Sequence, residues 1–597
     1  MRKSSLIFPS TMSDRGITHR LLAYVKTQQK AFIISAILML SAVGFELLLP
    51  ILFGEAASIL GEPDADFNRI LVIVAVSFVS LILSSLVQYG QTMMLQRAGQ
   101  TIIYGVREEV FTHIEAFSLA QLHSVPVGKM VTRVTNDTNA LNEMFTQIIM
   151  SLVKSVLMIV AVLIAMIIIS PILSLYVMII APLVGVSAFI FRKFSRAAYR
   201  EVRHNISNIN AFLSENLSGM KITQVCNQEE KKLNEFRVYN QALKKSSLKE
   251  VFVFAVFRPF IYVLYMITII IILWVGTKDN MAGGLVTYSI LLVFYQFVER
   301  LFGPIQRIAE DFNIMQSAFA SSERIFETLD TKLEIVDSPD ARDLEHVKGD
   351  IEFKNVWFYY KEGEWVLKDV SFKINAGETV AFVGATGSGK TTILSLVVRN
   401  FDIQQGQILI DGIDIKKIKV ASLRRHFGQM LQDVFLFSGT IESNIKMREE
   451  FTSDQVKEAC HYVNANHFIE QLPKQYEEEV RERGNNFSSG QRQLLSFART
   501  IIHRPAVMIL DEATANIDAE TELLIQDSLE KMMNIGTMIV VAHRLSTIQH
   551  ADSIIVLQKG VIIEQGTHQN LLKQKGHYYK LYQLQYQDTE EHSGKET

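Results

Sequence analysis

The chain has 597 residues, a net charge of −3 and a positive mean hydropathy of +0.19. A soluble protein of this length rarely averages apolar, so the composition argues against a wholly soluble protein and indicates more than one domain. The near-neutral charge gives no general electrostatic reason to bind nucleic acid. Two cysteines, Cys226 and Cys460, do not make a disulfide framework.

The long apolar runs lie in the first half of the chain. A helix that crosses a membrane needs about 20 mostly apolar residues. Runs of this kind occupy residues 31–54, 69–94, 146–170, 172–192, 251–276 and 284–304. Any one of them could be a buried core helix, but six such runs without comparable polar faces predict a transmembrane domain over residues 1–330. They also exclude a soluble ATPase.

Charge is distributed unevenly among the segments that join these runs. Basic residues gather before the first run and in the long segments 95–145 and 193–250, whereas acidic residues fill the segment between the first two runs. Because basic loops favour the cytoplasmic side, we expect a multi-pass plasma-membrane protein whose N-terminus and C-terminal domain are cytoplasmic. Helical apolar spacing in both long segments predicts cytoplasmic extensions of the membrane helices, and disordered loops are the alternative.

The second half of the chain has an ordinary charged composition. Residues 331–348 are acidic and irregular and contain Pro339, which indicates a linker. In residues 349–585, the order strand, glycine loop, helix at residues 379–397 is typical of a parallel α/β sheet. The last residues, 586–597, have the composition of a disordered tail.

The glycine loop carries the first chemical motif. Residues 384–391 read GATGSGKT, the pattern G-x-x-x-x-G-K-[ST]. Its glycines let backbone amides turn toward phosphate oxygens, and the following helix N-terminus adds a favourable partial charge. Lys390 is expected to reach the β- and γ-phosphates of ATP, and the Thr391 hydroxyl to bind Mg²⁺. The nucleotide-binding residues predicted here are Gly384, Ala385, Thr386, Gly387, Ser388, Gly389, Lys390, Thr391 and Thr392.

Two further predicted strands end in residues suited to ATP hydrolysis. Residues 507–512 read VMILDE, and two adjacent carboxylates after a buried strand are costly unless a cation or donors await them. Asp511 is therefore expected at the metal ion, and Glu512 beyond it, where it would polarise the attacking water. The strand MIVVAH presents His543 at the edge where such sheets bind ligands, so His543 is predicted to contact the γ-phosphate.

Together these features resemble an ABC transporter half-subunit of the exporter type, over almost the whole chain. The resemblance implies a six-helix all-α transmembrane domain with long cytoplasmic helical extensions, followed by an α/β P-loop nucleotide-binding domain. It also implies ATP hydrolysis coupled to transport, with ATP and Mg²⁺ as cofactors.

The same resemblance assigns roles to further motifs. LQDVFLFSGTI is similar to the family's Q-loop and places Gln432 at Mg²⁺ as a catalytic residue, and ANID is similar to the D-loop, with Asp518. Tyr360 aligns with the aromatic residue that stacks on adenine, and its neighbour Tyr359 is the alternative.

Residues 487–491 read FSSGQ, where the family usually has LSGGQ. The resemblance implies that Ser488, Ser489, Gly490 and Gln491 cap the ATP of a second subunit, so a monomer completes neither site. Tolerated drift in a homodimer is one explanation of Ser489. In heterodimeric exporters, however, an altered signature often comes from the subunit whose catalytic carboxylate is intact. The intact Glu512 and His543 therefore favour a different partner chain, with a regular LSGGQ and a weakened carboxylate.

The cargo is the least defined feature. We expect export of hydrophobic or amphipathic small molecules of the multidrug type, with a lipid or lipid-linked translocase as the alternative and a non-transporting channel or sensor as a third. Glu46 is a candidate for the transport path, whereas Arg258, Glu299 and Arg300 lie near enough to the interface to pair or to reach water. Aromatic and methionine residues could form an apolar cavity or ordinary packing: Phe254, Phe257, Phe260, Met266, Phe294 and Phe297.

Overall fold

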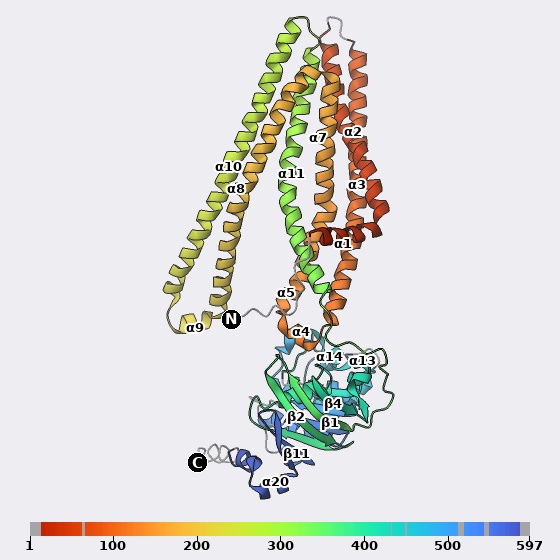
Figure 1. The fold of residues 1–597 in the computed structure, drawn as a ribbon, viewed down its shortest axis with the longest axis vertical. Helices are drawn as coiled ribbons and strands as arrows, with labels where there is room; N and C mark the ends of the chain where they lie inside the picture. The colour runs from red at the N-terminus through yellow and green to blue at the C-terminus, as the bar shows by residue number, and fades with distance from the viewer. Residues whose placement is uncertain are drawn as a thin grey trace. The chain divides into compact units, whose positions relative to one another are not determined.

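The computed structural model describes residues 14–62, 66–430, 433–447, 451–511, 519–541 and 548–584 (Figure 1). Its contacts divide the chain into two units. The first comprises Met1–Ala116 and Pro126–Lys332, and the second comprises Phe117–Val125 and Leu333–Thr597. The second unit thus contains the predicted linker and α/β domain, together with a short segment from the first predicted cytoplasmic extension.

The secondary structure described for the first unit consists of helices. These are α1 (Asp14–Thr27), α2 (Gln29–Leu60), α3 (Phe67–Glu115), α5 (Val127–Thr132), α6 (Thr138–Glu143), α7 (Ile149–Ile169), α8 (Pro171–Ser218), α9 (Met220–Val225), α10 (Glu229–Met281) and α11 (Tyr288–Leu329). Two π-helical turns, Arg133–Asp137 and Met144–Ile148, join α5, α6 and α7 into one helical run.

Within the described residues, five helical runs are long and apolar enough to cross a membrane. They are Gln29–Leu60, Phe67–Glu115, Val127–Ile169, Pro171–Ser218 and Glu229–Met281. The first five predicted spans fall within these runs, except that Ser170, the last residue of the third span, follows the end of its run. The sixth predicted span falls mainly in the first part of α11, where Glu299 and Arg300 interrupt the apolar sequence, and it stays a prediction.

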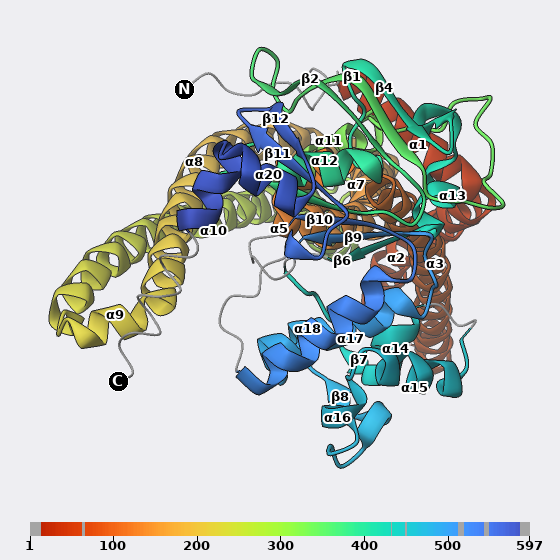
Figure 2. The ribbon, with the colours of Figure 1, turned by 90° about the horizontal axis from the view of Figure 1, so that it is seen from below.

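The predicted extensions of the membrane helices are helical. α3 has 49 residues, which corresponds to about 73 Å at 1.5 Å per residue, more than twice the ~30 Å of a bilayer core. α8 and α10 lie side by side and are joined by α9, with Gly219 at the end of α8 (Figures 1 and 2). Apolar residues of the other extension, Leu141 and Phe145, are fully buried, as their spacing predicts.

Local sequence explains where several of these helices begin. The Ser170 hydroxyl accepts a hydrogen bond from the backbone N–H of Leu173, and Pro171 occupies the first position of α8, where its missing N–H costs nothing. Asp66 caps α3 in the same way through the N–H of Asn68. The junctions between apolar runs are therefore set by caps in the sequence.

The second unit is an α/β domain. Its strands are β1 (Ile351–Tyr359), β2 (Trp365–Ile374), β3 (Thr379–Val383), β4 (Gln405–Ile410), β5 (Ile413–Asp414), β6 (Phe427–Met430), β7 (Gly439–Thr440), β8 (Glu479–Val480), β9 (Val507–Asp511), β10 (Thr537–Val541), β11 (Ser553–Gln558) and β12 (Val561–Gly566). Its helices are α4 (Leu119–Ser124), α12 (Lys390–Val397), α13 (Val420–Arg425), α14 (Ile441–Lys446), α15 (Ser453–Tyr462), α16 (Asn466–Ile469), α17 (Ser489–Ile501), α18 (Ala519–Met533) and α20 (His568–Gln574).

Two main sheets organise this domain. One has the order β2-β1-β4-β5 and is antiparallel, and the other has the order β12-β11-β3-β10-β9-β6. The strands from β11 to β6 in the second sheet are parallel. All residues of β3 and β10 are buried, as continuous apolar strands covered on both faces should be.

The short helix α4 belongs to this second unit. Ser118 begins it with a capping box, in which its side chain and that of Gln121 satisfy each other's backbone N–H groups. The Ser118 hydroxyl also donates to Glu334 at 2.6 Å, and the Glu334 N–H donates to Gln121 at 3.4 Å. These contacts fix α4 against the start of the C-terminal segment.

Candidate functional site

The nucleotide-site residues lie where neighbouring parallel strands end. In the register of the sheet, Val541 of β10 pairs with Phe382 of β3 on one side and with Asp511 of β9 on the other. The glycine loop that follows β3 and the carboxylate that ends β9 therefore lie at the same edge of the sheet, which is the ligand-binding edge of this fold class. The predicted residues Gln432, Glu512, Asp518 and His543 lie outside the described residues.

The glycine loop has a conformation that only small residues tolerate. Gly389 has φ +108° and is the N-cap of α12, and Gly387 has φ +78°, both in the left-handed region that favours glycine. A Cβ on Gly384 would overlap the carbonyl oxygen of Leu557. The loop thus keeps its backbone accessible at the N-terminus of a buried helix.

Lys390 is held inside this loop. Its side chain is 6% exposed, and its Nζ donates to the carbonyl oxygens of Gly384 at 2.7 Å and Ala385 at 3.1 Å. Burial lowers the pKa of Lys390, while the nearby carboxylate of Asp511 acts in the opposite direction. The structure therefore brings together the predicted phosphate lysine and the predicted metal ligand.

The loop also contains a polar atom that awaits a partner. The Ser388 side chain is 4% exposed, and within the described residues its hydroxyl has no hydrogen-bond partner. A buried hydroxyl without a partner is costly, and a phosphate oxygen would satisfy it. The donor set beside it, a threonine hydroxyl at Thr391 and the Asp511 carboxylate, consists of the oxygen ligands that Mg²⁺ prefers. The residues present thus fit a magnesium nucleotide.

Tyr360 and Tyr359 differ in their surroundings. The Tyr360 hydroxyl lies 3.0 Å from the Thr392 hydroxyl, directly after the loop, and its ring packs edge-on against Phe358 and Phe401 while remaining 51% exposed. The Tyr359 ring packs instead against Trp365 of β2. Only Tyr360 therefore has a contact with the predicted nucleotide-binding residues and an exposed ring.

The signature segment forms the start of α17. Ser488 is the N-cap, and its side chain and that of Gln491 form a capping box. Ser489 occupies the first helical position, which does not require the positive φ that would favour glycine. Phe487 is buried in the core and contacts Phe468 edge-on, so its role is packing. The capping residues Ser488 and Gln491 thus orient the helix N-terminus that the family resemblance assigns to a partner's phosphate.

Comparison with known proteins decides the family. Residues 32–305 match the family of the ABC transporter transmembrane region, and residues 367–515 match the ABC transporter ATP-binding family. The chain belongs to the ABC transporters. With one region of each kind it is a half-transporter, an ATPase coupled to transport that binds ATP, spans the membrane several times and dimerises with another ABC subunit.

Relatives with different names share most of the chain. It is 38% identical over 515 residues to the Bacillus subtilis (strain 168) protein named "Probable multidrug resistance ABC transporter ATP-binding/permease protein YheH", covering 85% of this chain and 75% of the relative. It is 31% identical to the multidrug resistance-like ATP-binding protein MdlB of Buchnera aphidicola, covering 95% and 98%. It is 34% identical to the ATP-dependent lipid A-core flippase of Syntrophus aciditrophicus, covering 84% and 83%.

The membrane helices of this transporter contain a polar cavity. It has a volume of about 500 Å³ and lies among α2, α3, α7 and α11. The residues that line it are Glu46, Gln88, Ser151, Lys154, Ser155, Met158, Gln296, Glu299, Arg300, Gly303, Pro304 and Arg307. Glu46 accepts a hydrogen bond from Lys154 Nζ at 2.8 Å. Glu46, Glu299 and Arg300 were recognised in the sequence, whereas Lys154 and Arg307 were missed, although a lysine inside the apolar run 146–170 is a visible signal.

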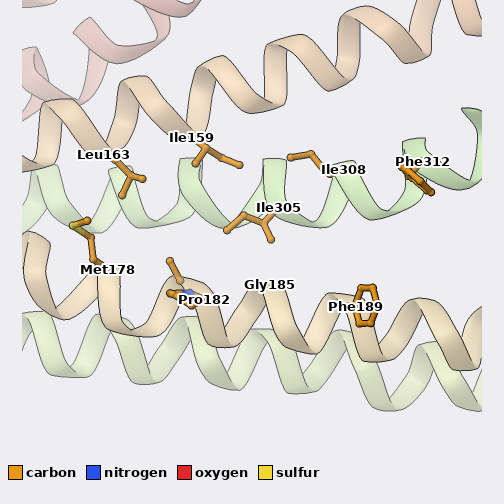
Figure 3. Close-up of a pocket in the computed structure, with 10 residues that line it drawn as sticks. Ile159, Leu163, Met178, Pro182, Gly185, Phe189, Ile305, Ile308 and Phe312 are labelled. Carbon is orange, nitrogen blue, oxygen red and sulfur yellow. The ribbon is translucent and has the colours of Figure 1, made fainter. Parts of the chain in front are cut away.

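A second cavity of about 540 Å³ is apolar and lies among α7, α8 and α11. Figure 3 shows its lining: Ile159, Leu163, Met178, Ala181, Pro182, Gly185, Phe189, Ile305, Ile308 and Phe312. The aromatic residues named from the sequence line neither cavity. Phe294 and Phe297 are fully buried in the helix core, and Phe257 stacks on Phe191, so packing is the correct reading for these three.

Proposed function

We propose that the chain exports hydrophobic or amphipathic compounds of the multidrug type across the plasma membrane, driven by ATP held between two nucleotide-binding domains. The observation that carries this proposal is a phosphate loop, with a buried lysine and a buried hydroxyl that has no partner among the described residues, in the same chain as long apolar helices that line two cavities. Binding of ATP favours the closed pair of domains and product release favours the open one, so the nucleotide acts by its differential affinity for two states.

The proposed roles in the site follow from the chemistry of each side chain. Lys390 and the loop amides bind the β- and γ-phosphates, and Thr391, Asp511 and Gln432 hold Mg²⁺. Glu512 polarises the attacking water, and His543 holds water and γ-phosphate in line. A magnesium ion bound there would neutralise charge on the phosphates.

Replacing Glu512 by Gln tests this function. The amide cannot take up a proton from water, so turnover should fall by about 10²-fold or more while ATP binding is retained. Glu520→Gln is the matched control, because Glu520 lies exposed in the first turn of α18. Undiminished ATP-dependent efflux in the Glu512→Gln variant would refute transport driven by this site.

We further propose that the partner is a different chain. Ser489 adds a side chain at the N-terminus of α17, where a glycine would leave the backbone open to a partner's phosphate. The partner should therefore combine a regular LSGGQ segment with a weakened catalytic carboxylate. Co-purification from the native cell should yield two different half-transporters. An active dimer of this chain alone, with equal hydrolysis at both sites, would refute the heterodimer.

Orientation is also part of the proposal. The long helical extensions contain many lysines and arginines, whereas the connecting residues 61–66 and 282–287 contain none, and this distribution supports a cytoplasmic N-terminus and nucleotide-binding domain. A cysteine introduced between α2 and α3, at Glu62 for example, should react with a membrane-impermeant thiol reagent in intact cells. Cys226, an exposed cysteine at the end of α9, should react only after permeabilisation. The opposite pattern would reverse the orientation.

A lipid or lipid-linked translocase is the second candidate, because two relatives are named ATP-dependent lipid A-core flippases. Stimulation of ATP hydrolysis by apolar drugs in a neutral bilayer would support multidrug export, and stimulation by lipids alone would support the alternative. A non-transporting sensor is disfavoured by the presence of both Glu512 and His543 in the sequence.

A further inference from the structure

The charges of the polar cavity do not balance. Glu46 and Lys154 form an ion pair at 2.8 Å and neutralise each other, with side chains 23% and 24% exposed. The remaining ionisable residues of the lining are Glu299, Arg300 and Arg307. A single carboxylate therefore faces two guanidinium groups, and the lining keeps an excess of one positive charge.

The two arginines are unpaired within the described part of the chain. Among the residues that the structure describes, neither Arg300 nor Arg307 forms an ion pair or a side-chain hydrogen bond. Arg300 is only partly exposed. Arg300 lies in the predicted span 284–304, where a charged side chain is expensive and marks a functional site by default, and Arg307 lies just beyond this span and is exposed. A guanidinium offers several donors in a planar fork that matches carboxylate and phosphate oxygens.

Neutral polar side chains line the same cavity as these arginines. Gln88 of α3, Ser151 of α7 and Gln296 of α11 face the same space, so an anion held there would meet further hydrogen-bond donors. The donors come from three helices that are far apart in sequence.

An apolar surface begins at the next residues of the same helices. On α7, Met158 lines the polar cavity and its neighbour Ile159 lines the apolar one. On α11, Arg307 lines the polar cavity and Ile308 lines the apolar one. Adjacent Cα atoms are about 3.8 Å apart, so polar and apolar linings occur at the same level of α7 and α11. Because successive side chains of a helix point in different directions, α7 and α11 present a polar lining on one face and an apolar lining on another, so these helices carry a matching surface for an anionic group and for a hydrocarbon part.

We propose that the polar cavity binds the anionic group of an amphipathic cargo, a phosphate or carboxylate on a hydrocarbon skeleton, through Arg300 and Arg307. This inference rests on the proposed export function and narrows its substrate class from hydrophobic compounds in general to amphipathic anions. Charge complementarity excludes a cationic amphiphile as the preferred occupant.

The test uses the full-length transporter with its partner subunit in phosphatidylcholine vesicles. Binding of three probes is measured without nucleotide: dodecyl phosphate, dodecyltrimethylammonium and inorganic phosphate. Dodecyl phosphate should bind most tightly and stimulate ATP hydrolysis. Arg300→Gln and Arg307→Gln should each weaken its binding about tenfold, since each removes a charge-assisted hydrogen-bond donor. Tight binding of inorganic phosphate alone would overturn the need for a hydrocarbon part.

Two further variants keep the test independent of folding. Arg300→Lys preserves the charge and should retain more binding than Arg300→Gln. Arg258→Gln removes an arginine of α10 that lies near Phe254 and lines neither cavity, and it should bind dodecyl phosphate like the unmodified protein. Equal binding of the cationic probe, or unchanged binding in both glutamine variants, would overturn the inference while leaving ATP-driven export intact. Loss of export itself is detected separately by the Glu512→Gln experiment.

Discussion

The nucleotide-binding domain and the membrane helices assemble their polar sites in opposite ways. In the former, Gly384 to Gly389 form one continuous loop that leads directly into α12, and Lys390 at the start of this helix donates back to the loop carbonyls. In the latter, the lining of the polar cavity comes from four helices, and Glu46 meets a lysine 108 positions away. A site formed by one continuous segment can be recognised in the sequence as a motif, whereas a site formed by the packing of separate helices cannot.

The largest effect is expected when one side chain of the phosphate loop is removed. Lys390→Ala removes a buried cation from the phosphate loop, so ATP hydrolysis should fall by about 10²–10³-fold. Lys373→Ala, in an exposed position of β2, should leave hydrolysis unchanged. Steady-state ATPase assays on both variants make the measurement. An equal loss of ATP hydrolysis in both variants would show that hydrolysis does not depend specifically on the phosphate-loop lysine.

The sequence predicted the strand, loop and helix of the phosphate loop for the same reason. The order of β3, glycine loop and α12 follows from a buried apolar strand and glycines with required positive φ, which are local properties. The capping box of Ser488 and Gln491 is also local, but it was read from the sequence only as a signature motif. The segment Phe117–Val125 groups with the second unit, which no local pattern could predict.

A second experiment tests packing in the membrane helices. A Cβ on Gly99 of α3 would overlap Thr146 Cγ2, whereas a Cβ on Gly105 of the same helix would meet nothing within 4 Å. Gly99→Ala should therefore destabilise the protein by about 1–3 kcal/mol through overpacking. Gly105→Ala should be neutral or slightly stabilising, because alanine favours helix. Thermal unfolding in detergent compares the two, and similar midpoints would contradict the close approach.

The membrane half was predictable in outline only. Helix lengths and junctions follow from apolar runs and caps such as Ser170, so the first five spans match long apolar helices. The partners across the bundle depend on how helices rotate about their axes, which hydropathy does not encode. Glu46 and Lys154 are each visible as charges inside apolar runs, but only the packing of α2 against α7 shows that they form a pair.

Comparing two ion pairs sharpens the contrast between the regions. Glu46–Lys154 in the membrane helices has side chains about one quarter exposed, and Asp343–Lys419 in the nucleotide-binding domain is about half exposed. Double-mutant cycles with Glu46→Gln and Lys154→Met should give a coupling free energy of about 1–2 kcal/mol. The same cycle on Asp343 and Lys419 should give a coupling too small to measure, because water screens the pair. A larger coupling in the surface pair would reverse the ranking.

The smallest effect is expected from a test of which of two adjacent tyrosines, Tyr359 or Tyr360, stacks on the adenine of ATP. Tyr360 contacts Thr392 and keeps an exposed ring, whereas Tyr359 packs on Trp365. If Tyr360 stacks on adenine, Tyr360→Ala should raise the ATP concentration for half-maximal hydrolysis about five- to tenfold, the range expected for loss of one base–aromatic stack. Tyr359→Ala should change it less than twofold, since its ring faces the sheet. The same measurements with GTP test whether the effect depends on the base. A larger effect of Tyr359→Ala would assign the stacking role to Tyr359, the last residue of β1.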